Sequence, residues 1–175
     1  MGKERGYTLV GLLTAVALLA LLSAGGAPVF ADLAHQARFD TATDRLHRAI
    51  RFTRHAAVTR GTPVVMAASG ADWRRGWLIF VDSNADGEPQ AAEPRLRHAG
   101  ALPPAITAAA NTGIGEALHY QPDGGTRRPS GSLQMGTFAL CQRDAQGRPI
   151  GHRSIIINAS GRARIVVHDP PGDDC

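Results

Sequence analysis

The first third of the chain shows two successive hydrophobic patterns. Residues 7–27 are 21 positions without a charged side chain, and a helix of that length spans about 30 Å, the hydrocarbon thickness of a bilayer. Between Leu33 and Val58 there is no glycine or proline, and apolar residues recur at the spacing of one helix face. The members of this face are Phe39, Ala42, Leu46, Ala49, Ile50, Thr53 and Ala57, whereas Arg45, Arg48, Arg51 and Arg54 fall toward the opposite side.

Together the two patterns predict one helix from Tyr7 to Arg60. Its expected flaw is the run Gly25-Gly26-Ala27-Pro28, where proline removes an amide donor and glycines loosen the backbone. We therefore expect a kink or a locally melted turn at this point.

Two other structures compete for the apolar segment, a buried core helix and a secretory signal peptide. The segment is too long and apolar for the first. The second is favoured by a basic start at Lys3 and Arg5 and by Val29-Phe30-Ala31, which has the small residues of a cleavage site. Because the helical pattern continues beyond Ala31, the sequence favours a membrane helix that is retained.

After residue 60 the pattern changes to short β-rich runs that alternate with turn residues. The predicted strands are Thr62–Ala68, Gly76–Asp82, Ala117–Gln121, Ser132–Gln142, Arg153–Asn158 and Arg162–Val167. The segment Ala99–Gly115, with Pro103-Pro104 and few charges, is expected to be an irregular connection. This part of the chain is long enough for one modest domain with an antiparallel sheet.

The N-terminus resembles that of type IV pilins and type II secretion pseudopilins. Lys3, Arg5 and Gly6 are similar to the short basic leader of that family, Tyr7 stands where the family has its methylated aromatic residue, Thr8-Leu9 continue the motif, and Pro28 takes the place of a common kinking proline. The resemblance implies that prepilin peptidase cuts between Gly6 and Tyr7 and methylates the new amine of Tyr7. Gly11 stands where the family usually has a glutamate. The absence of this carboxylate favours a minor or tip position in a filament.

Four further motifs narrow the resemblance to the GspH/FimT group of minor pseudopilins and pilins. They are Arg75–Asp82, Glu93–Arg97, Gly136–Cys141 and Ser160–Ile165. The resemblance implies an α+β, pilin-like fold, in which the long N-terminal helix packs on an antiparallel β-rich head. The implied segments are a leader at 1–6, a transmembrane half-helix at 7–31, an amphipathic periplasmic half at 32–60, and the head at 61–175.

The implied function is assembly as a minor subunit, in a type II secretion pseudopilus or in a type IV pilus. The implied partners are other pilin or pseudopilin subunits, prepilin peptidase, the inner-membrane assembly platform and, before assembly, membrane lipid. The basic N-terminal flank indicates a single-pass protein of the inner membrane with its head in the periplasm.

Charge adds an alternative function. Residues 127–168 carry seven arginines and one aspartate, a net charge of +6, and clustered guanidinium groups bind phosphates. Some FimT-type pilins take up DNA through an arginine-bearing C-terminal motif, which Gly161-Arg162-Ala163-Arg164 resembles. The candidate DNA-binding residues are Arg143, Arg148, Arg153, Arg162 and Arg164.

Cysteines and acidic residues suggest two further sites. Cys141 and Cys175 are the only cysteines, and in an oxidising periplasm we expect a disulfide between them, with two free thiols as the alternative. The loop from Asp82 to Glu93 has the spacing of a calcium loop, with Asp82, Asn84, Asp86 and Glu93 as ligands, although its flanks read as strands.

The seven histidines have no HxxxH or HxH spacing, so we predict neither an enzyme nor a cofactor.

Overall fold

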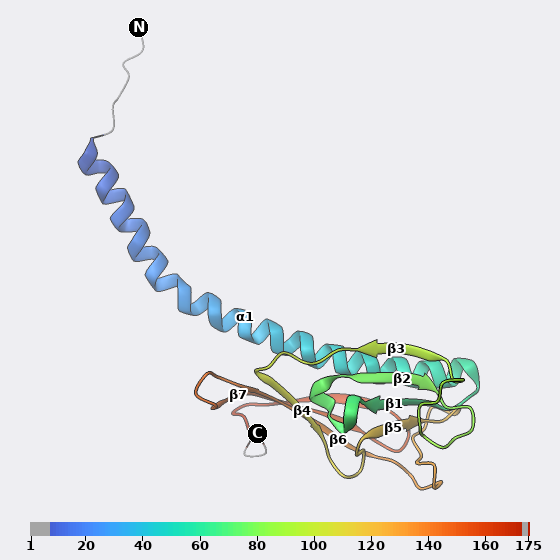
Figure 1. Cartoon of the computed structure of the whole chain (residues 1–175). Helices are drawn as coiled ribbons and strands as arrows, with labels where there is room; N and C mark the ends of the chain where they lie inside the picture. The colour runs from blue at the N-terminus through green and yellow to red at the C-terminus, as the bar shows by residue number, and fades with distance from the viewer. Residues whose placement is uncertain (1–7, 173–174) are drawn as a thin grey trace. The chain divides into compact units, whose positions relative to one another are not determined.

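The computed structural model describes residues 8–172 and 175, without the side chains of residues 21–32. One long helix, α1 (Leu9–Arg60), precedes eight strands and two short 3-10 helices (Figure 1). The later elements are β1 (Val64–Ala68), η1 (Ser69–Ala71), η2 (Trp73–Arg75), β2 (Trp77–Val81), β3 (Arg95–Ala99), β4 (Ile106–Ala110), β5 (Ala117–Tyr120), β6 (Gly136–Arg143), β7 (Pro149–Ile157) and β8 (Ala163–His168).

The chain forms two compact units, Met1–Arg38 and Phe39–Cys175. Helix α1 starts just after Thr8, whose side chain accepts a hydrogen bond from the Gly11 amide at 3.3 Å and so satisfies one donor of the first turn. The helix is unbroken through Gly25–Pro28, so the melted turn that the sequence suggested is absent, and the kink stays a prediction.

A search of the described residues finds no helix whose length and hydropathy are sufficient to cross a membrane. The membrane segment expected at residues 7–31 includes Tyr7 and the side chains of residues 21–31, which lie outside the described part.

Two four-stranded antiparallel sheets make up the second unit, with strand orders β3-β2-β1-β5 and β4-β6-β7-β8. The register of the first sheet aligns Met66 of β1 with Ile79 of β2 and Leu118 of β5. In the second sheet, Phe138 of β6 lies opposite Ile155 of β7. The side chains of all five residues are fully buried, so each sheet has one face in the core.

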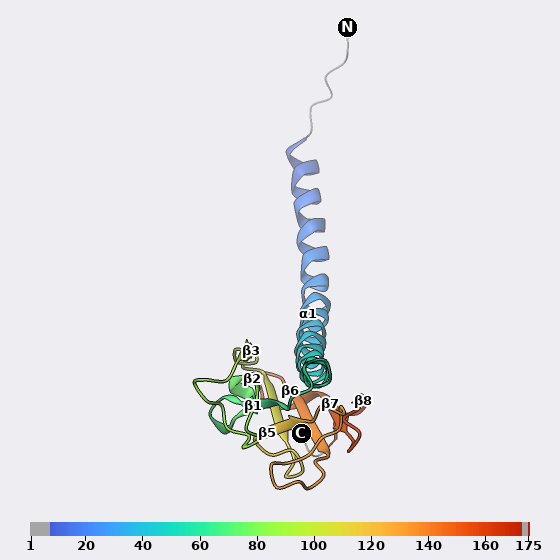
Figure 2. The ribbon, with the colours of Figure 1, turned by 90° about the vertical axis from the view of Figure 1, so that its right-hand side faces the viewer.

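The second part of α1 completes this core. Every member of the helix face defined from the sequence, from Phe39 to Ala57, is buried, and Leu46 and Ile50 are 0% exposed. They join one cluster with residues of both sheets, including Trp77 and Phe138. Figure 2 shows the last turns of α1 end-on, with β1–β3 to one side and β8 to the other. This arrangement confirms the α+β, pilin-like fold class expected from the sequence.

Two predictions about the strands need correction. The segment Ala99–Gly115, expected to be irregular, contains β4, which pairs with β6 from Ile106↔Gln142 to Ala110↔Phe138. Its Ile-Thr-Ala-Ala-Ala sequence has weak strand propensity, and the pairing and the burial of Ile106 and Ala108 outweigh it. The sequence also predicted no strand at β3, where Arg97 places its guanidinium 3.6 Å from the Phe52 ring centroid.

The α1 arginines, which the sequence places toward the side opposite the apolar face, differ in their surroundings. Arg45 is half-buried and donates a hydrogen bond to the Gly100 carbonyl at 2.8 Å, with its guanidinium 5.2 Å from the Trp77 ring centroid. Long arginine side chains reach around the edge of an apolar face because their stems are themselves apolar. Arg48 is exposed, as expected.

Candidate functional site

Three of the five C-terminal arginines have partners within the molecule. Arg143 donates to the carbonyls of Gly147 (2.7 Å) and Cys175, and Arg148 pairs with Asp144 at 2.7 Å. Arg153 pairs with Asp40 of α1 and lies over the Phe39 ring. These three guanidinium groups are therefore engaged within the molecule.

The remaining two, Arg162 and Arg164, are exposed, and no side-chain partner for either is found among the described residues. Arg162 lines a cavity of about 290 Å³ that also holds Arg51 and Arg54 of α1, whereas Arg164 does not line it. Sequence reasoning missed the two helix residues as site residues. Their three-residue spacing puts them near each other on one helix, but nothing in the sequence connects them to a turn more than 100 positions away.

The candidate calcium loop between β2 and β3 is closed by its own amides. Asp82 is 2% exposed, and its carboxylate accepts hydrogen bonds from the amides of Asp86 (3.1 Å) and Gly87 (3.0 Å). Glu93 accepts from the amides of Ser83 (2.8 Å) and Gln90 (3.2 Å). Burial raises the pKa of Asp82, the hydrogen bond from Gly87 opposes this, and the Glu93 carboxylate adds to it.

Asn84 and Asp86 complete the predicted ligand set, and they bond to each other at 2.8 Å between the Asn84 amide and an Asp86 carboxylate oxygen. Within the described part of the chain, the carboxylates of this loop are not among the His, Cys, Asp and Glu side chains that lie close enough together to share a metal ion. Calcium binding by this loop stays a prediction, because the hydrogen bonds of the loop satisfy its carboxylates without an ion.

The two cysteines are joined, as expected from the sequence: Cys141 of β6 and the terminal Cys175 form a disulfide. His152 of β7 lies beside it, stacks on His168 of β8 with 4.2 Å between ring centroids, and accepts a hydrogen bond from the Gly172 amide at 3.2 Å. The two sulfurs and a His152 nitrogen lie within 4.8 Å of one another. Since both sulfurs are in the disulfide, they are not thiolate ligands in this structure.

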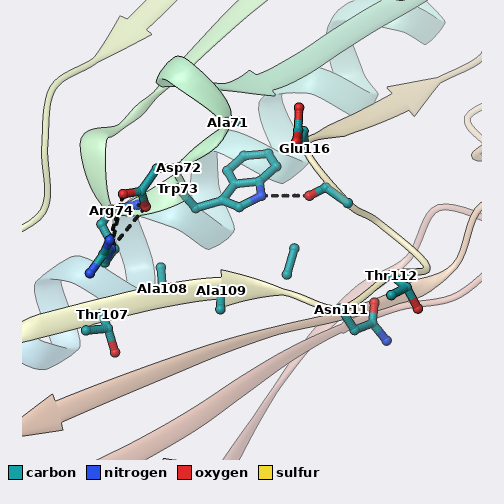
Figure 3. Close-up of a pocket in the computed structure, with 12 residues that line it drawn as sticks. Ala71, Asp72, Trp73, Arg74, Thr107, Ala108, Ala109, Asn111, Thr112 and Glu116 are labelled. Carbon is teal, nitrogen blue, oxygen red and sulfur yellow. Dashed lines mark hydrogen bonds and ion pairs between the residues drawn. The ribbon is translucent and has the colours of Figure 1, made fainter.

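A second cavity, of about 530 Å³, lies between η2 and β4 (Figure 3). The Trp73 indole nitrogen donates to the Gly115 carbonyl at 2.9 Å, and on the same η2 side Asp72 pairs with Arg74 at 2.9 Å. The side-chain hydrogen bond from Arg74 lowers the pKa of Asp72. Thr107, Ala108 and Ala109 line the strand side, and Asn111, Thr112 and Glu116 add polar side chains to the lining.

The residues of the predicted peptidase site, Gly6 and Tyr7, lie outside the described residues. Gly11 is described, on the first turns of α1, where the side chains of Leu9, Val10, Leu12 and Leu13 are 60–75% exposed. Further along the same segment Val16, Leu18 and Leu19 are also exposed. This stretch of apolar helix has no covering partner among the described residues.

A long N-terminal helix whose second part completes the core of a two-sheet antiparallel head defines the pilin-like class of proteins. The family model described as type II transport protein GspH matches residues 42–161. The chain therefore belongs to the GspH family.

Solved structures share this fold. The type IV minor pilin FimU of Pseudomonas aeruginosa, in two crystal forms, is 21% identical, with TM-scores of 0.55 and 0.57; the alignments cover 76% and 77% of this chain and 90% and 97% of FimU. The minor pseudopilin EpsH from the type 2 secretion system of Vibrio cholerae is 10% identical, with a TM-score of 0.53. Its alignment covers 73% of this chain and 95% of EpsH. Among curated proteins no match is found. None of these findings supports the DNA-binding alternative.

Proposed function

We propose that this chain is a minor subunit of a type II secretion pseudopilus or a type IV pilus and functions by assembly. Membership of the GspH family supports this function. The observation that carries it is the exposed apolar stretch of α1, in which Leu9, Val10 and Leu12 are 75%, 68% and 64% exposed. An uncovered apolar surface of this extent marks a site for lipid or for protein partners.

Before assembly, lipid covers this stretch. Residues 7–31 form the membrane half of the helix, residues 1–6 are the leader on the cytoplasmic side, and the head lies in the periplasm. The disulfide supports this placement, because structural disulfides persist in oxidising compartments. Prepilin peptidase removes the leader after Gly6 and methylates Tyr7.

On assembly, helices of other pilin or pseudopilin subunits replace the lipid, through the inner-membrane assembly platform. A carboxylate inside this apolar environment is stable only beside an opposite charge, such as the amine of a neighbouring subunit. Gly11 offers no carboxylate for that pairing. The chain therefore occupies a minor or terminal position, and is not repeated along the filament.

Processing is tested by the intact mass of the chain after co-expression with a prepilin peptidase. The wild type should lose residues 1–6 and gain one methyl group, and Gly6→Val should keep the leader, because a branched side chain blocks the small position before the cut. Gly2→Val is the matched control inside the leader and should be processed normally. A mature chain that begins at Asp32 would show instead that the segment is a signal peptide.

Assembly is tested at Gly11. Gly11→Glu should increase the number of copies found in sheared filaments, measured by quantitative immunoblotting, because the new carboxylate can pair with a neighbouring amine. Gly11→Gln has nearly the same shape without the charge and should behave as the wild type. If neither variant nor wild type is recovered with filament subunits, the assembly proposal is wrong.

A further inference from the structure

Three arginines from two distant segments line one cavity, which we call the arginine pocket. Arg51 and Arg54 lie on α1, and Arg162 follows the turn between β7 and β8. The cavity has a volume of about 290 Å³, and its remaining walls are formed by Ile50, Tyr120, Gly161 and Ala163. All of these residues belong to the compact unit Phe39–Cys175.

Arg54 is held in place by the backbone around the pocket. Its Nε donates to the Gly124 carbonyl at 3.0 Å, and Nη2 donates to the Ser160 carbonyl at 3.4 Å. A guanidinium group has five N–H donors, so these two bonds leave three for another acceptor. The Tyr120 hydroxyl donates to the Gly161 carbonyl at 3.0 Å and fixes the same turn.

Arg51 and Arg162 are exposed, and among the residues that the structure describes neither side chain has a hydrogen-bond or ion-pair partner. Among the residues that the structure describes, no acidic side chain lines the pocket. Three guanidinium groups around one small cavity repel one another, and an anion that enters the cavity removes that repulsion and gains charge-assisted hydrogen bonds.

We propose that the arginine pocket binds a carboxylate group on a neighbouring subunit of the assembly. The identity of the partner rests on the proposed function, whereas the capacity to bind a carboxylate does not. At about 290 Å³, the pocket has room for a single glutamate or aspartate side chain inserted from another protein surface.

The arrangement of these charges suits a nucleic acid less well than a single carboxylate. A duplex presents phosphates along a rod, and its binding requires several arginines in a row on the surface. Arg143, Arg148 and Arg153 would have to extend such a row, and their guanidinium groups are engaged within the molecule. The pocket is therefore a local site for one anionic group.

The test uses the purified full chain in a nonionic detergent and follows its thermal unfolding as sodium glutarate replaces sodium chloride at constant ionic strength. Glutarate carries the carboxylate of a glutamate side chain. Saturable binding should raise the unfolding midpoint by about 4–6 °C at ten times the dissociation constant. In Arg51→Gln/Arg162→Gln, the half-saturating concentration should rise roughly tenfold or more, because two charged donors are lost.

Arg164→Gln is the matched control, since Arg164 is exposed, belongs to the same motif and does not line the pocket. It should respond to glutarate as the wild type does. Both substituted arginines lack side-chain partners among the described residues, so the double variant should unfold near the wild-type temperature without glutarate.

Two results would overturn the proposal. One is a glutarate effect that is absent or equal in the wild type and the double variant. The other is tight, salt-sensitive binding of a duplex oligonucleotide that Arg162→Gln and Arg164→Gln weaken alike, which would assign these arginines to DNA. If the chain is processed and enters filaments but does not respond to glutarate, the pocket proposal fails and the proposed function stands.

Discussion

Gly161 gives the sharpest test of how the arginine pocket is built. Its φ of +74° lies in the left-handed region, and a Cβ at this position would lie 2.0 Å from the Gly124 carbonyl oxygen and 2.7 Å from the Tyr120 ring. The turn before Arg162 can therefore approach Gly124 this closely only without a side chain. Gly161→Ala should displace the turn and weaken the hydrogen bonds that Arg54 makes to both sides.

Two costs contribute to the loss of stability expected for Gly161→Ala. A left-handed backbone costs an L-residue about 1–2 kcal/mol, and relief of the overlap with a backbone oxygen costs about 1–3 kcal/mol more. For a unit of roughly 140 residues, each kcal/mol lowers the unfolding midpoint by about 3–4 °C. Gly161→Ala should therefore lower the midpoint by about 10 °C, measured by calorimetry or circular dichroism.

Gly147 supplies the matched control. Its φ is +79°, and a Cβ there would meet nothing within 4 Å. Gly147→Ala isolates the backbone cost, with a fall of about 5 °C. If both substitutions lower the midpoint equally, Gly161 is not in close contact with Gly124 and the described pocket wall is wrong.

Three other predictions concern the head. Leu46→Ala should cost about 2–5 kcal/mol in urea unfolding because Leu46 is 0% exposed, whereas Val58→Ala on the same helix, 49% exposed, should cost less than about 0.5 kcal/mol; equal losses would contradict the packing of α1. Reduction of the disulfide, or its replacement by two serines, should cost at most about 4 kcal/mol, since the bond closes a loop with a sequence separation of 34; two alkylatable thiols in material purified from the periplasm would disprove the bond. Burial lowers the pKa of His119 in the folded chain below 6.5, its ordinary value. As the pH falls, the unfolded chain therefore binds a proton at His119 before the folded chain does, so the free energy of unfolding is unaffected above about pH 6.5 and decreases below it. His119→Gln should reduce this loss in urea titrations between pH 7 and pH 5, and an unchanged pH profile would refute the assignment.

The helix face and most strands could be predicted from the sequence because each rests on local periodicity. All seven face residues are buried, and the runs around β1, β2, β5, β6 and β8 match strands to within a few residues. Strand β4 could not be predicted in this way. Its three alanines carry little strand preference, and the strand forms because β6 offers a partner from a distant part of the chain.

The pocket was beyond sequence reasoning for the same reason. The motif at Gly161–Arg164 identified Arg162, but the contact between Arg54 and Gly124 joins positions 70 residues apart. Likewise, the engagement of Arg153 depends on Asp40 of α1. Counting charges along the chain overestimates a basic surface when tertiary contacts pair some of those charges inside the molecule.

The disulfide also determines how the chain transmits mechanical force. A pull applied between α1 and the C-terminal residue passes from Cys175 directly to Cys141. The 34 residue steps between them, which include β7 and β8, lie outside this covalent path. Extension of the oxidised chain should be shorter by about 120 Å than that of the reduced chain. While the bond is intact, a filament subunit pulled from this end would keep β7, β8 and the turn at Gly161 free of tension.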